Sequence, residues 1–570
     1  MKTRNALVVL HAAALLVAAC GAKQQKPDEK VHVEATETAQ EAAAPTFEIL
    51  AFNDLHGHLV GPAGHVEVHG EEVEAGGAAY LAARIAAIRK RDPNTVVVTA
   101  GDNIGASPLV SSLFHDEPTI EALDAMKVDA SAVGNHEFDE GVDELLRMQN
   151  GGCHPQDGCQ DGDGFAGASF PYLAANVTNE KTGKTLFPAY VVKNIDGVDV
   201  AFIGLTLAGT PSIVAPAGIS TLAFHDEIET IDKAVDELHQ KGIHAIVVLI
   251  HQGGEPGAEQ TDVNECPDVE GPIVDIVNGV DDDVDIFVTG HTHQAYICRM
   301  DGKLVTSAKS YGRLLTDIDV TLDVASGDIA SAKATNLVVD RTSKPSPAVA
   351  TIVDKYTKLV APLANKEIGR ITKTISAEPD DSGESEMGKL IADIQLWATK
   401  AGDAGGAQIA LMNPGGVRDS LHYEPRGDEN PGVVTYSEAH TVQPFGNSLV
   451  TMTLTGAQLH ELLEAQWKDD GPTRILQPSA GFTYSWDRNA AVGSRVDPAS
   501  MELDGKPVDP KANYRVTVNS FLATGGDDFP LLREGTDRVG GLVDLQAFVR
   551  YFDEKSPVSP PVDDRIRLKP

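Results

Sequence analysis

Aromatic side chains are scarce in this sequence of 570 residues, of which Phe, Trp and Tyr together make up 5%. Basic residues are also few, since 46 Lys and Arg stand against 84 Asp and Glu and give a formal net charge of −38 at pH 7. Such an acidic excess disfavours binding to nucleic acid or anionic membranes through a basic patch. Apolar residues still form 42% of the chain, enough to bury large cores. We therefore expect a globular protein without a nucleic-acid partner.

Long apolar runs are absent too, apart from one near the N-terminus. Lys2 and Arg4 precede a stretch from Leu7 to Ala19 that is too short to span a bilayer as a helix and ends in small residues, which is typical of a secretory signal peptide. The adjoining LVAAC resembles a bacterial lipobox, so we expect cleavage before Cys20 and acylation of its thiol. An ordinary signal peptide that happens to end near a cysteine is the alternative.

This N-terminal pattern predicts where the protein is found. Residues 1–19 would be the signal peptide, and residues 20–45 would be a flexible tether because they contain few large apolar side chains. The mature protein would be exported and held by its lipid at the cell membrane or the outer membrane, facing the periplasm or the exterior. We expect no other membrane contact and a monomer.

Cysteine is rare, with five in the chain. In an exported protein an odd count leaves one thiol over, and acylation of Cys20 would account for it. The other four cysteines allow three pairings, and we favour Cys153 with Cys159, across a Gly- and Asp-rich loop, and Cys266 with Cys298. Metal binding by these thiolates is the alternative, but it suits an oxidising compartment poorly.

Five short segments combine a β-branched apolar run with hard metal ligands at its end. They are AFNDLHGHL (51–59), VVVTAGDN (96–103), SAVGNHEFD (131–139), IVVLIHQGG (246–254) and DIFVTGHTH (285–293). The runs are typical of strands buried on both faces, and open α/β sheets form their sites at the carboxyl ends of strands. A single polar residue after a strand is more often a cap or turn, but five in the same position indicate one site.

The ligand types suit two divalent ions. Ions about 3.5–4 Å apart need a shared anionic bridge, imidazole or amide ligands and open positions for water and substrate, and Asp102 is the natural bridge. Two pairs of ligands lie two residues apart, so strand alternation would point both members of a pair to one side. The candidate ligands are Asp54, His56, Asp102, Asn135, His251, His291 and His293. Such mixed donors suit Zn, Mn, Fe or Co.

In order and spacing, these segments resemble the calcineurin-like metallophosphoesterases, and more closely their 5'-nucleotidase branch. The resemblance implies how the ligands divide. One ion would be held by Asp54, His56, Asp102 and His293, and the other by Asp102, Asn135, His251 and His291. It also implies a catalytic dyad in which Asp139 orients and charges His136. A hydrogen bond from His136 to a metal ligand is the alternative role.

Three further segments resemble the substrate-binding domain of the same family: MNPGGVRDSL (412–421), TVQPFGNSLVTMTLTG (441–456) and NSFLATGGDDFP (519–530). The match implies that Phe445 and Phe521 sandwich a nucleobase, because stacking tolerates any base. The remaining assignments are Asn447 to the base edge, Asp527 to the ribose hydroxyls, and Arg418 with Asn413 nearby to the phosphate.

One segment departs from the family pattern. EPDDSGESEMGKLIAD (378–393) contains no Arg, although the better-known nucleotidases have a phosphate-binding arginine just before MGxLI. The phosphate would then be held by Arg418 and the metals, unless Arg426 or Arg370 substitutes. A weaker clamp leaves cyclic nucleotides, dinucleotides and nucleotide sugars open as substrates.

Together these patterns predict an α/β protein of two large domains. Residues 46–340 would form a four-layer metallophosphoesterase sandwich, 341–365 a linker helix, and 366–560 an α/β substrate-binding domain. The expected activity is that of an extracytoplasmic 5'-nucleotidase in which hydroxide attacks phosphorus beside two metal ions. The alternatives are a 2',3'-cyclic-nucleotide phosphodiesterase, a UDP-sugar or dinucleotide hydrolase, a thiosulfohydrolase, and a non-catalytic ligand-binding lipoprotein.

Overall fold

The computed structural model describes residues 44–68, 70–257, 260, 262–426, 429–468 and 473–569. The expected signal peptide, the lipidation site at Cys20 and nearly all of the tether lie outside the described residues. Within the described part of the chain, no helix has both the length and the apolar character needed to cross a bilayer.

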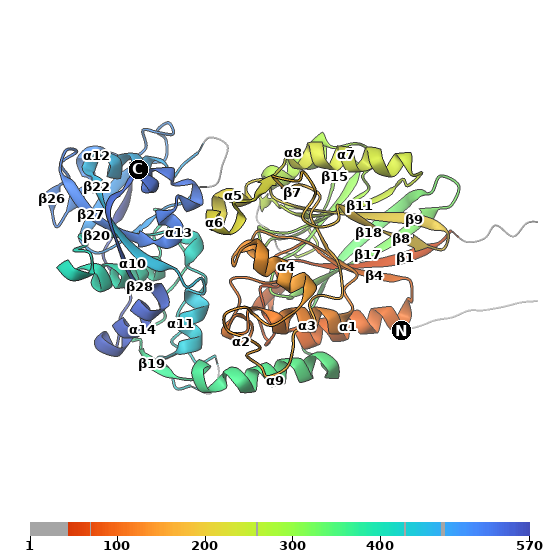
Figure 1. Cartoon of the computed structure of the whole chain (residues 1–570), viewed down its shortest axis with the longest axis horizontal. Coiled ribbons are helices and arrows are strands. Elements are labelled where there is room, and N and C mark those ends of the chain that lie inside the picture. Colours follow the sequence, from red (N-terminus) through yellow and green to blue (C-terminus); the bar gives the residue numbers. More distant parts are fainter. Residues whose placement is uncertain are drawn as a thin grey trace, which may run out of the picture. The chain divides into compact units, whose positions relative to one another are not determined.

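Two six-stranded sheets form the centre of the first half of the chain (Figure 1). One has the order β18 (Asp328–Val338), β17 (Leu314–Asp323), β1 (Thr46–Phe52), β4 (Thr95–Thr99), β5 (Ala130–Ala132) and β6 (Tyr172–Leu173). The other has the order β15 (Ala295–Met300), β16 (Lys303–Ala308), β14 (Ile286–Thr289), β11 (Ala245–His251), β9 (Val198–Thr206) and β8 (Tyr190–Ile195). In each sheet four neighbouring strands run parallel, from β1 to β6 and from β16 to β9.

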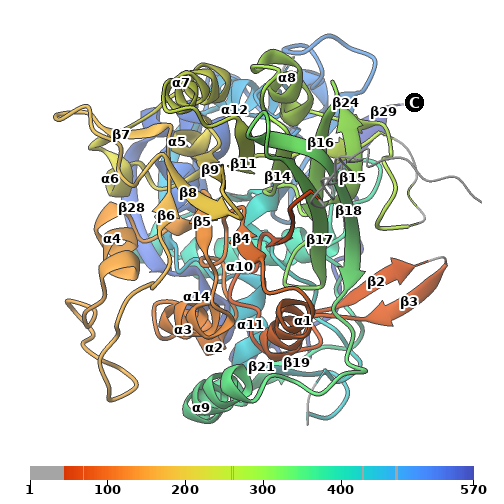
Figure 2. The same cartoon turned by 90° about the vertical axis from the view of Figure 1, so that its right-hand side faces the viewer.

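The two sheets face each other across an apolar layer to which β1 contributes Phe47 and Ile49, and β11 contributes Val247 and Leu249. Helices cover both outer faces (Figure 2). They are α1 (Ala78–Arg91), α3 (Glu117–Met126) and α4 (Val142–Asn150) on one face, and α7 (Glu227–Gln240) and α8 (Pro272–Gly279) on the other. Every residue of β11 is buried, as expected for a strand covered on both sides. The four-layer α/β sandwich predicted from the sequence is confirmed.

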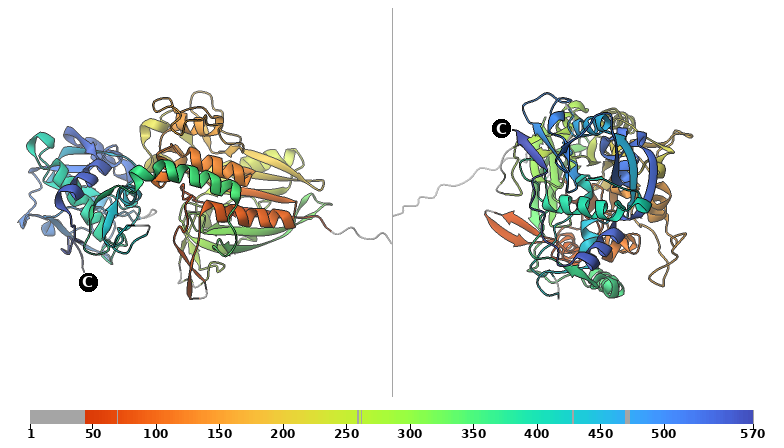
Figure 3. Two further views of the ribbon diagram at one scale, coloured as in Figure 1. Left: turned by 90° about the horizontal axis from the view of Figure 1, so that it is seen from below. Right: turned by 90° about the vertical axis from the view of Figure 1, so that its left-hand side faces the viewer.

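A helix of 18 residues, α9 (Pro347–Ala364), lies within the segment expected to link the domains. It begins with Pro at its first position, where the missing N–H costs nothing. Figure 3 shows α9 beside α1, and it also contacts α3 and α2 (Leu109–Ser112). Tyr356 and Val360 anchor it because both side chains are buried in the core under α1 and α3.

The second half contains two more sheets. The larger has the order β23 (Gln477–Pro478), β20 (Ile409–Met412), β27 (Asn513–Asn519), β22 (Ser448–Thr455) and β28 (Thr536–Val543). The smaller has the order β26 (Lys506–Pro507), β25 (Glu502–Leu503), β24 (Phe482–Asp487) and β29 (Ile566–Lys569). Since β29 pairs with β24, this folded half continues past residue 560, where we expected it to end.

Helices α10 (Glu386–Thr399), α11 (Tyr436–Val442) and α14 (Asp544–Lys555) share one apolar cluster of this half, and α12 (Gly456–Glu464) packs in another with both sheets. The remaining elements are short. They are β2 (His65–Val68), β3 (Glu71–Glu74), β7 (Val177–Asn179), β10 (Leu222–Phe224), β12 (Glu255–Pro256), β13 (Val269–Glu270), β19 (Glu367–Arg370), β21 (Val433–Thr435), α5 (Thr210–Ile213), α6 (Pro216–Ile219) and α13 (Ser520–Ala523).

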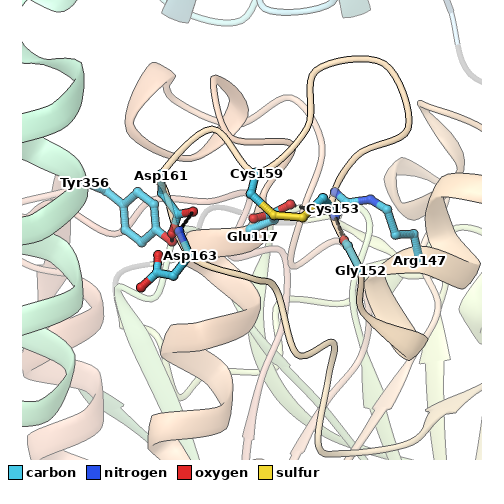
Figure 4. Close-up of a disulfide and its surroundings, with 8 residues drawn as sticks. All are labelled: Glu117, Arg147, Gly152, Cys153, Cys159, Asp161, Asp163 and Tyr356. Carbon is cyan, nitrogen blue, oxygen red and sulfur yellow. Dashed lines mark hydrogen bonds and ion pairs between the residues drawn. A yellow bond between two sulfur atoms is a disulfide. The ribbon is translucent and has the colours of Figure 1, made fainter.

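Both disulfides favoured from the sequence are present in the structure, Cys153–Cys159 and Cys266–Cys298. The first closes a loop that follows α4, and Figure 4 shows how that loop is held. At its start, Arg147 Nη1 donates to the carbonyl of Gly152 at 2.7 Å. The loop after Cys159 is bound to α9, since Tyr356 donates to Asp161 at 2.8 Å and Lys355 pairs with the same carboxylate at 2.6 Å. Asp161 and Asp163 thus both pair with Lys355, and this part of the Gly- and Asp-rich loop is docked on α9.

Candidate active site

The predicted metal ligands lie together at the carboxyl ends of parallel strands from both sheets of the first half, where His251 is the last residue of its strand and the others follow theirs. One sheet supplies Asp54, His56, Asp102 and Asn135, and the other supplies His251, His291 and His293. Three overlapping sets of donor atoms at this centre lie within 4.8 Å of one another. They are Asp54, His56 and His293; Asp102, His251 and His291; and His56, Asp102 and His136. The first two sets are compatible with the division between two ions that the family resemblance implies, and the third adds His136 as a neighbour of Asp102.

Strand alternation is not what brings these side chains together. Asp54 and His56 lie after the last residue of β1 and have φ of 50° and 45°, while His291 and His293 lie after β14 with φ of 73° and 58°. Asp102 likewise has φ of 49°. Residues other than Gly seldom adopt this left-handed region, and when they do they concentrate at functional sites. Left-handed residues just after the strands therefore direct the ligands inward, whereas strand alternation had been expected to align them.

Backbone carbonyls fix two of the imidazoles. His56 Nδ1 lies 2.8 Å from the carbonyl of Gly105, and His251 Nδ1 lies 2.7 Å from the carbonyl of Ala100. Because a carbonyl only accepts, each Nδ1 donates and each ring presents its Nε2 to the centre of the site. His56 Nε2 lies 3.2 Å from His293 Nε2, so two ring nitrogens face each other there.

The donor set fits divalent metal ions. Asn135 Oδ1 is buried and has no hydrogen-bond partner among the described residues. His251 Nε2 lies 2.9 Å from Asp102 Oδ2. Burial lowers the pKa of this imidazole, but the charge and hydrogen bond of Asp102 have the larger effect and raise the pKa to about 9. A proton and a metal ion therefore compete for Nε2. A cation beside Asp102 would also give the amide oxygen of Asn135 a partner.

Glu137 holds the turn that carries Asp102, a role that our reading of the sequence missed. Its buried carboxylate accepts the backbone N–H groups of Asp102 and Asn103, each at 2.9 Å, and of Gly134 at 2.6 Å. Burial and the charge of Asp102 raise the pKa of Glu137 to about 7. Gly134 is required because a Cβ there would overlap the Asp102 carboxylate. The sequence signal for both residues is their place in GNHE.

The predicted dyad is present. His136 Nδ1 lies 2.8 Å from Asp139 Oδ2, and the backbone N–H of His136 donates to Asp102 Oδ1 at 2.8 Å. Burial lowers the pKa of His136, but Asp139 and Asp102 outweigh it and raise the pKa above its ordinary value. An imidazolium beside the metal ligands can donate a proton or stabilise negative charge.

A cavity of about 350 Å³ adjoins this centre and is lined by both halves of the chain. The first half contributes Asn135, His136, Asp139 and His291. The second half contributes all six residues predicted to bind substrate, Asn413, Arg418, Phe445, Asn447, Phe521 and Asp527. The predicted metal ligands Asn135 and His291 and the side chains predicted to bind a nucleotide therefore line one cavity.

Hydrogen bonds refine two of the predicted roles. Asn447 Oδ1 accepts from Ser520 Oγ at 2.9 Å and from the backbone N–H of Phe521 at 3.2 Å, which leaves its Nδ2 to meet a ligand. Asn413 was expected near the phosphate, but its Nδ2 donates to Asp527 Oδ2 at 2.8 Å. Asn413 therefore positions the carboxylate predicted to bind ribose.

The arginines of the cavity are Arg418 and Arg474, as far as the described lining shows. The guanidinium carbon of Arg418 lies 5.8 Å from the ring centroid of Phe445. Arg474 was not predicted, and its Nε lies 3.6 Å from Asp527 Oδ1. Arg370 and Arg426, considered above as replacements for the missing phosphate-binding arginine, are not among the described lining residues. Arg370 pairs with Glu367, and Arg426 pairs with Asp419. Of the two arginines among the described lining residues, Arg474 lies beside Asp527, so Arg418 is the one left for the predicted phosphate.

Comparison with known proteins agrees with this arrangement. The family model for calcineurin-like phosphoesterases matches residues 47–295, and that for the 5'-nucleotidase C-terminal domain matches residues 367–534. A crystal structure of a 5'-nucleotidase precursor from Thermus thermophilus is 29% identical, with a TM-score of 0.73, and the match covers 92% of this chain and 99% of that one.

Two curated relatives are also similar over most of this chain. Endonuclease YhcR of Bacillus subtilis is 35% identical over 545 residues, which cover 93% of this chain but 42% of YhcR. Cell wall protein Lmo0130 of Listeria monocytogenes is 32% identical over 551 residues, which cover 91% of this chain and 69% of Lmo0130. The chain thus spans less than half of the length of YhcR. By both halves of its sequence and by its fold, the chain belongs to the 5'-nucleotidase family of calcineurin-like metallophosphoesterases, which are hydrolases of phosphoester bonds.

Proposed function

We propose that the protein is an extracytoplasmic, metal-dependent nucleotidase that releases phosphate from nucleoside 5'-phosphates. The observation that carries the proposal is the shared cavity, in which His136 and Asn135 lie on the same lining as Phe445 and Phe521. A substrate that fills it offers an apolar base at one end and a phosphate at the other. A nucleotide has both.

Binding would begin in the second half of the chain. The base would stack between Phe445 and Phe521, with Asn447 Nδ2 at its edge. The carboxylate of Asp527, held by Asn413 and Arg474, would accept hydrogen bonds from the ribose hydroxyls. These contacts do not change during the reaction, so they would orient the phosphate toward the metal ligands without taking part in bond cleavage.

The proposed metal sites are the two groups of ligands bridged by Asp102. Two divalent ions bound there would supply a nucleophile from water at neutral pH and neutralise charge on the phosphoryl oxygens. The imidazolium of His136, charged by Asp139, would stabilise the developing negative charge or protonate the leaving oxygen of ribose. Glu137 would keep Asp102 in position through its three backbone hydrogen bonds.

The proposed location is outside the cytoplasm, with an acylated Cys20 as anchor. The LVAAC sequence supports export and lipidation. Lmo0130, a relative matched along most of its length, is named a cell wall protein. Mass spectrometry of the N-terminal peptide tests the anchor, because a diacylglyceryl-modified Cys20 would support it and an unmodified cysteine would exclude it.

A second candidate is hydrolysis of cyclic nucleotides, dinucleotides or nucleotide sugars. The observation in its favour is the single arginine, Arg418, at the phosphate end of the described cavity lining. With fewer positive charges, the site would discriminate less against a diester, which carries less negative charge than a monoester. The name of YhcR, an endonuclease, is consistent with a diester substrate.

The test is hydrolysis by the purified protein, first metal-free and then with Mn²⁺ or Zn²⁺, followed as inorganic phosphate from AMP and as the nucleotide, sugar phosphate or p-nitrophenol product from the other substrates. The substrates are AMP, UDP-glucose, a 2',3'-cyclic nucleotide and bis(p-nitrophenyl) phosphate, and Asn135→Ala is the control variant. Metal-dependent release from AMP that the variant loses would support the nucleotidase. Hydrolysis of the diesters but not of AMP would favour the second candidate. Inactivity on all four substrates would favour a ligand-binding lipoprotein without catalytic activity.

A further inference from the structure

Asp527 lies beside one of the two rings proposed to bind the base. Its backbone has φ of 53°, in the left-handed region that residues other than Gly seldom adopt. The preceding residue is Gly526, where a Cβ would lie 2.5 Å from atoms of the Phe521 ring. The ring therefore packs against this backbone, and a nucleotide stacked on Phe521 would bring its ribose near the Asp527 carboxylate, which lines the same cavity.

The carboxylate is oriented but not saturated with donors. Asn413 Nδ2 donates to Asp527 Oδ2 at 2.8 Å, and this amide is itself fixed because Asn413 Oδ1 accepts from Asn519 Nδ2 at 2.8 Å. Arg474 Nε lies 3.6 Å from the other oxygen, Oδ1. A carboxylate can accept about four hydrogen bonds. Among the described residues no other donor bonds it, so each oxygen can still accept one hydroxyl, and ribose has two neighbouring hydroxyls.

Arg474 is anchored by the residue that follows Asp527. Its Nη1 donates to Asp528 Oδ2 at 3.1 Å, and Lys468 Nζ lies 2.8 Å from the same oxygen. The side chain of Arg474 is 18% exposed and that of Asp527 is 10% exposed, so solvent screens their charges little. Arg474 is thus held as the cation beside Asp527.

The ionisation of Asp527 depends on this arginine. Burial raises the pKa of the Asp527 carboxyl above its ordinary value, whereas the charge of Arg474 and the hydrogen bond from Asn413 lower it. Without Arg474 the pKa would lie higher still, because Asp528 remains as a neighbouring negative charge. A protonated carboxyl has no charge and fewer acceptor positions, so it would bind a pair of hydroxyls less tightly.

We propose that Arg474 is a positioning residue that makes the site select ribonucleotides over 2'-deoxyribonucleotides, by holding Asp527 as a two-oxygen acceptor for the ribose hydroxyls. The inference rests on the nucleotide site proposed above. Ribose would fill both acceptor positions, whereas 2'-deoxyribose would leave one of them empty. A site that hydrogen-bonds a hydroxyl rejects the analogue that lacks it. The expected preference is about 10- to 150-fold, the range for one hydrogen bond to a charged group.

The experiment measures binding rather than turnover. AMP and 2'-deoxy-AMP are titrated by calorimetry into the full-length protein, kept metal-free to prevent hydrolysis. Arg474→Gln should reduce the preference for AMP to about 2- to 10-fold, the range for a hydrogen bond between neutral groups. Arg474→Lys keeps the charge and should retain most of the preference. Arg495→Gln is the matched control, since Arg495 packs on Trp467 at 5.6 Å and is not among the described lining residues, and it should bind both nucleotides as wild type does.

A pH series separates this role from a merely structural one. The ratio of the two affinities should fall at low pH as Asp527 takes up a proton. The midpoint of that fall should lie at higher pH in Arg474→Gln than in wild type, because the arginine lowers the pKa of Asp527. A variant whose site had only lost its shape would show a low ratio at every pH. Other titrating groups cancel in the ratio, since both nucleotides carry the same base and phosphate.

Two results would overturn the inference. One is equal affinity of the wild-type protein for both nucleotides, which does not depend on any variant folding. The other is an Arg474→Gln variant that keeps the wild-type ratio at every pH. Failure of the proposed function has a different signature, namely no hydrolysis of AMP once metal is restored, and a preference for AMP in binding would still support the role of Arg474.

Discussion

The imidazole of His136 lies nearly parallel to the phenyl ring of Phe445, with ring centroids 5.8 Å apart and an interplanar angle of 15°. His136 follows β5 of the first half, and Phe445 precedes β22 of the second half. Arg418 also approaches the Phe445 ring, at 5.8 Å. Phe445 therefore links the proposed base-binding side chains to the dyad, and a base stacked on it would lie close to the catalytic centre.

Replacing His136 with Asn should lower kcat by about 10²- to 10⁴-fold, the usual contribution of a general acid. The physical reason is the loss of the proton that Asp139 and Asp102 hold on the ring, where they raise its pKa. Steady-state kinetics on the best substrate, together with the metal content, checks this. Because the dyad is distinct from the assigned ligands, the metal content should not change, and a variant that lost metal in parallel would identify His136 as a ligand.

Replacing Phe521 with Ala should raise KM by about 5- to 150-fold, since stacking on an aromatic side chain contributes roughly 1–3 kcal/mol per base. The value of kcat should change little, because the base does not take part in bond cleavage. Phe521→Tyr keeps the ring and is the matched control. An unchanged KM for AMP in Phe521→Ala would show that the base does not bind at this ring.

How much of this site could be predicted from the sequence depends on how local each signal is. The ligands follow apolar runs at once, so their convergence at the strand ends is predictable from sheet geometry. The left-handed turns that aim Asp54 and His56 are not, because positive φ is uncommon for any residue except Gly and its modest enrichment at Asp and His does not identify individual positions.

Long-range contacts explain what was missed in the second half. Arg474 reaches Asp527 across a separation of more than fifty residues, and nothing around Arg474 in the sequence marks it. Asn413 illustrates the same limit, since the motif identifies the residue but only the fold shows that its amide holds Asp527. The α/β class was predictable because strands such as β11 are continuous buried apolar runs, and the four-layer sandwich followed from the family resemblance.

Removing the metals with a chelator should abolish hydrolysis and lower the melting temperature. Asp54 and Asp102 are both fully buried in one small site, and bound cations would neutralise their charges. An ion at about 100 times its Kd contributes about 2.7 kcal/mol to stability. Calorimetry before chelation, after it and after addition of Mn²⁺ measures the effect. An identical melting temperature in all three samples would mean that no ion binds the folded state at these groups.

Stability should fall as pH rises from about 4 to 7 in part because of Asp544. Its carboxyl is buried at the start of α14, and burial raises its pKa to about 7 from the ordinary 3.8. In that window the folded protein binds the proton more tightly than the unfolded chain does, so each step up in pH favours unfolding. A shift of this size corresponds to a loss on the order of 4 kcal/mol above pH 7.

Asp544→Asn should remove this loss, since the amide oxygen can still accept the backbone N–H of Leu545, which the carboxylate accepts at 2.7 Å. Urea denaturation of wild type and variant at pH 5 and at pH 8 isolates the effect, because other titrating groups cancel in the difference between the two proteins. The free energy of unfolding of the variant, relative to that of wild type, should be higher at pH 8 than at pH 5. If the difference between the proteins is the same at both pH values, Asp544 ionises as easily in the folded state as in the unfolded chain, and its burial carries no penalty.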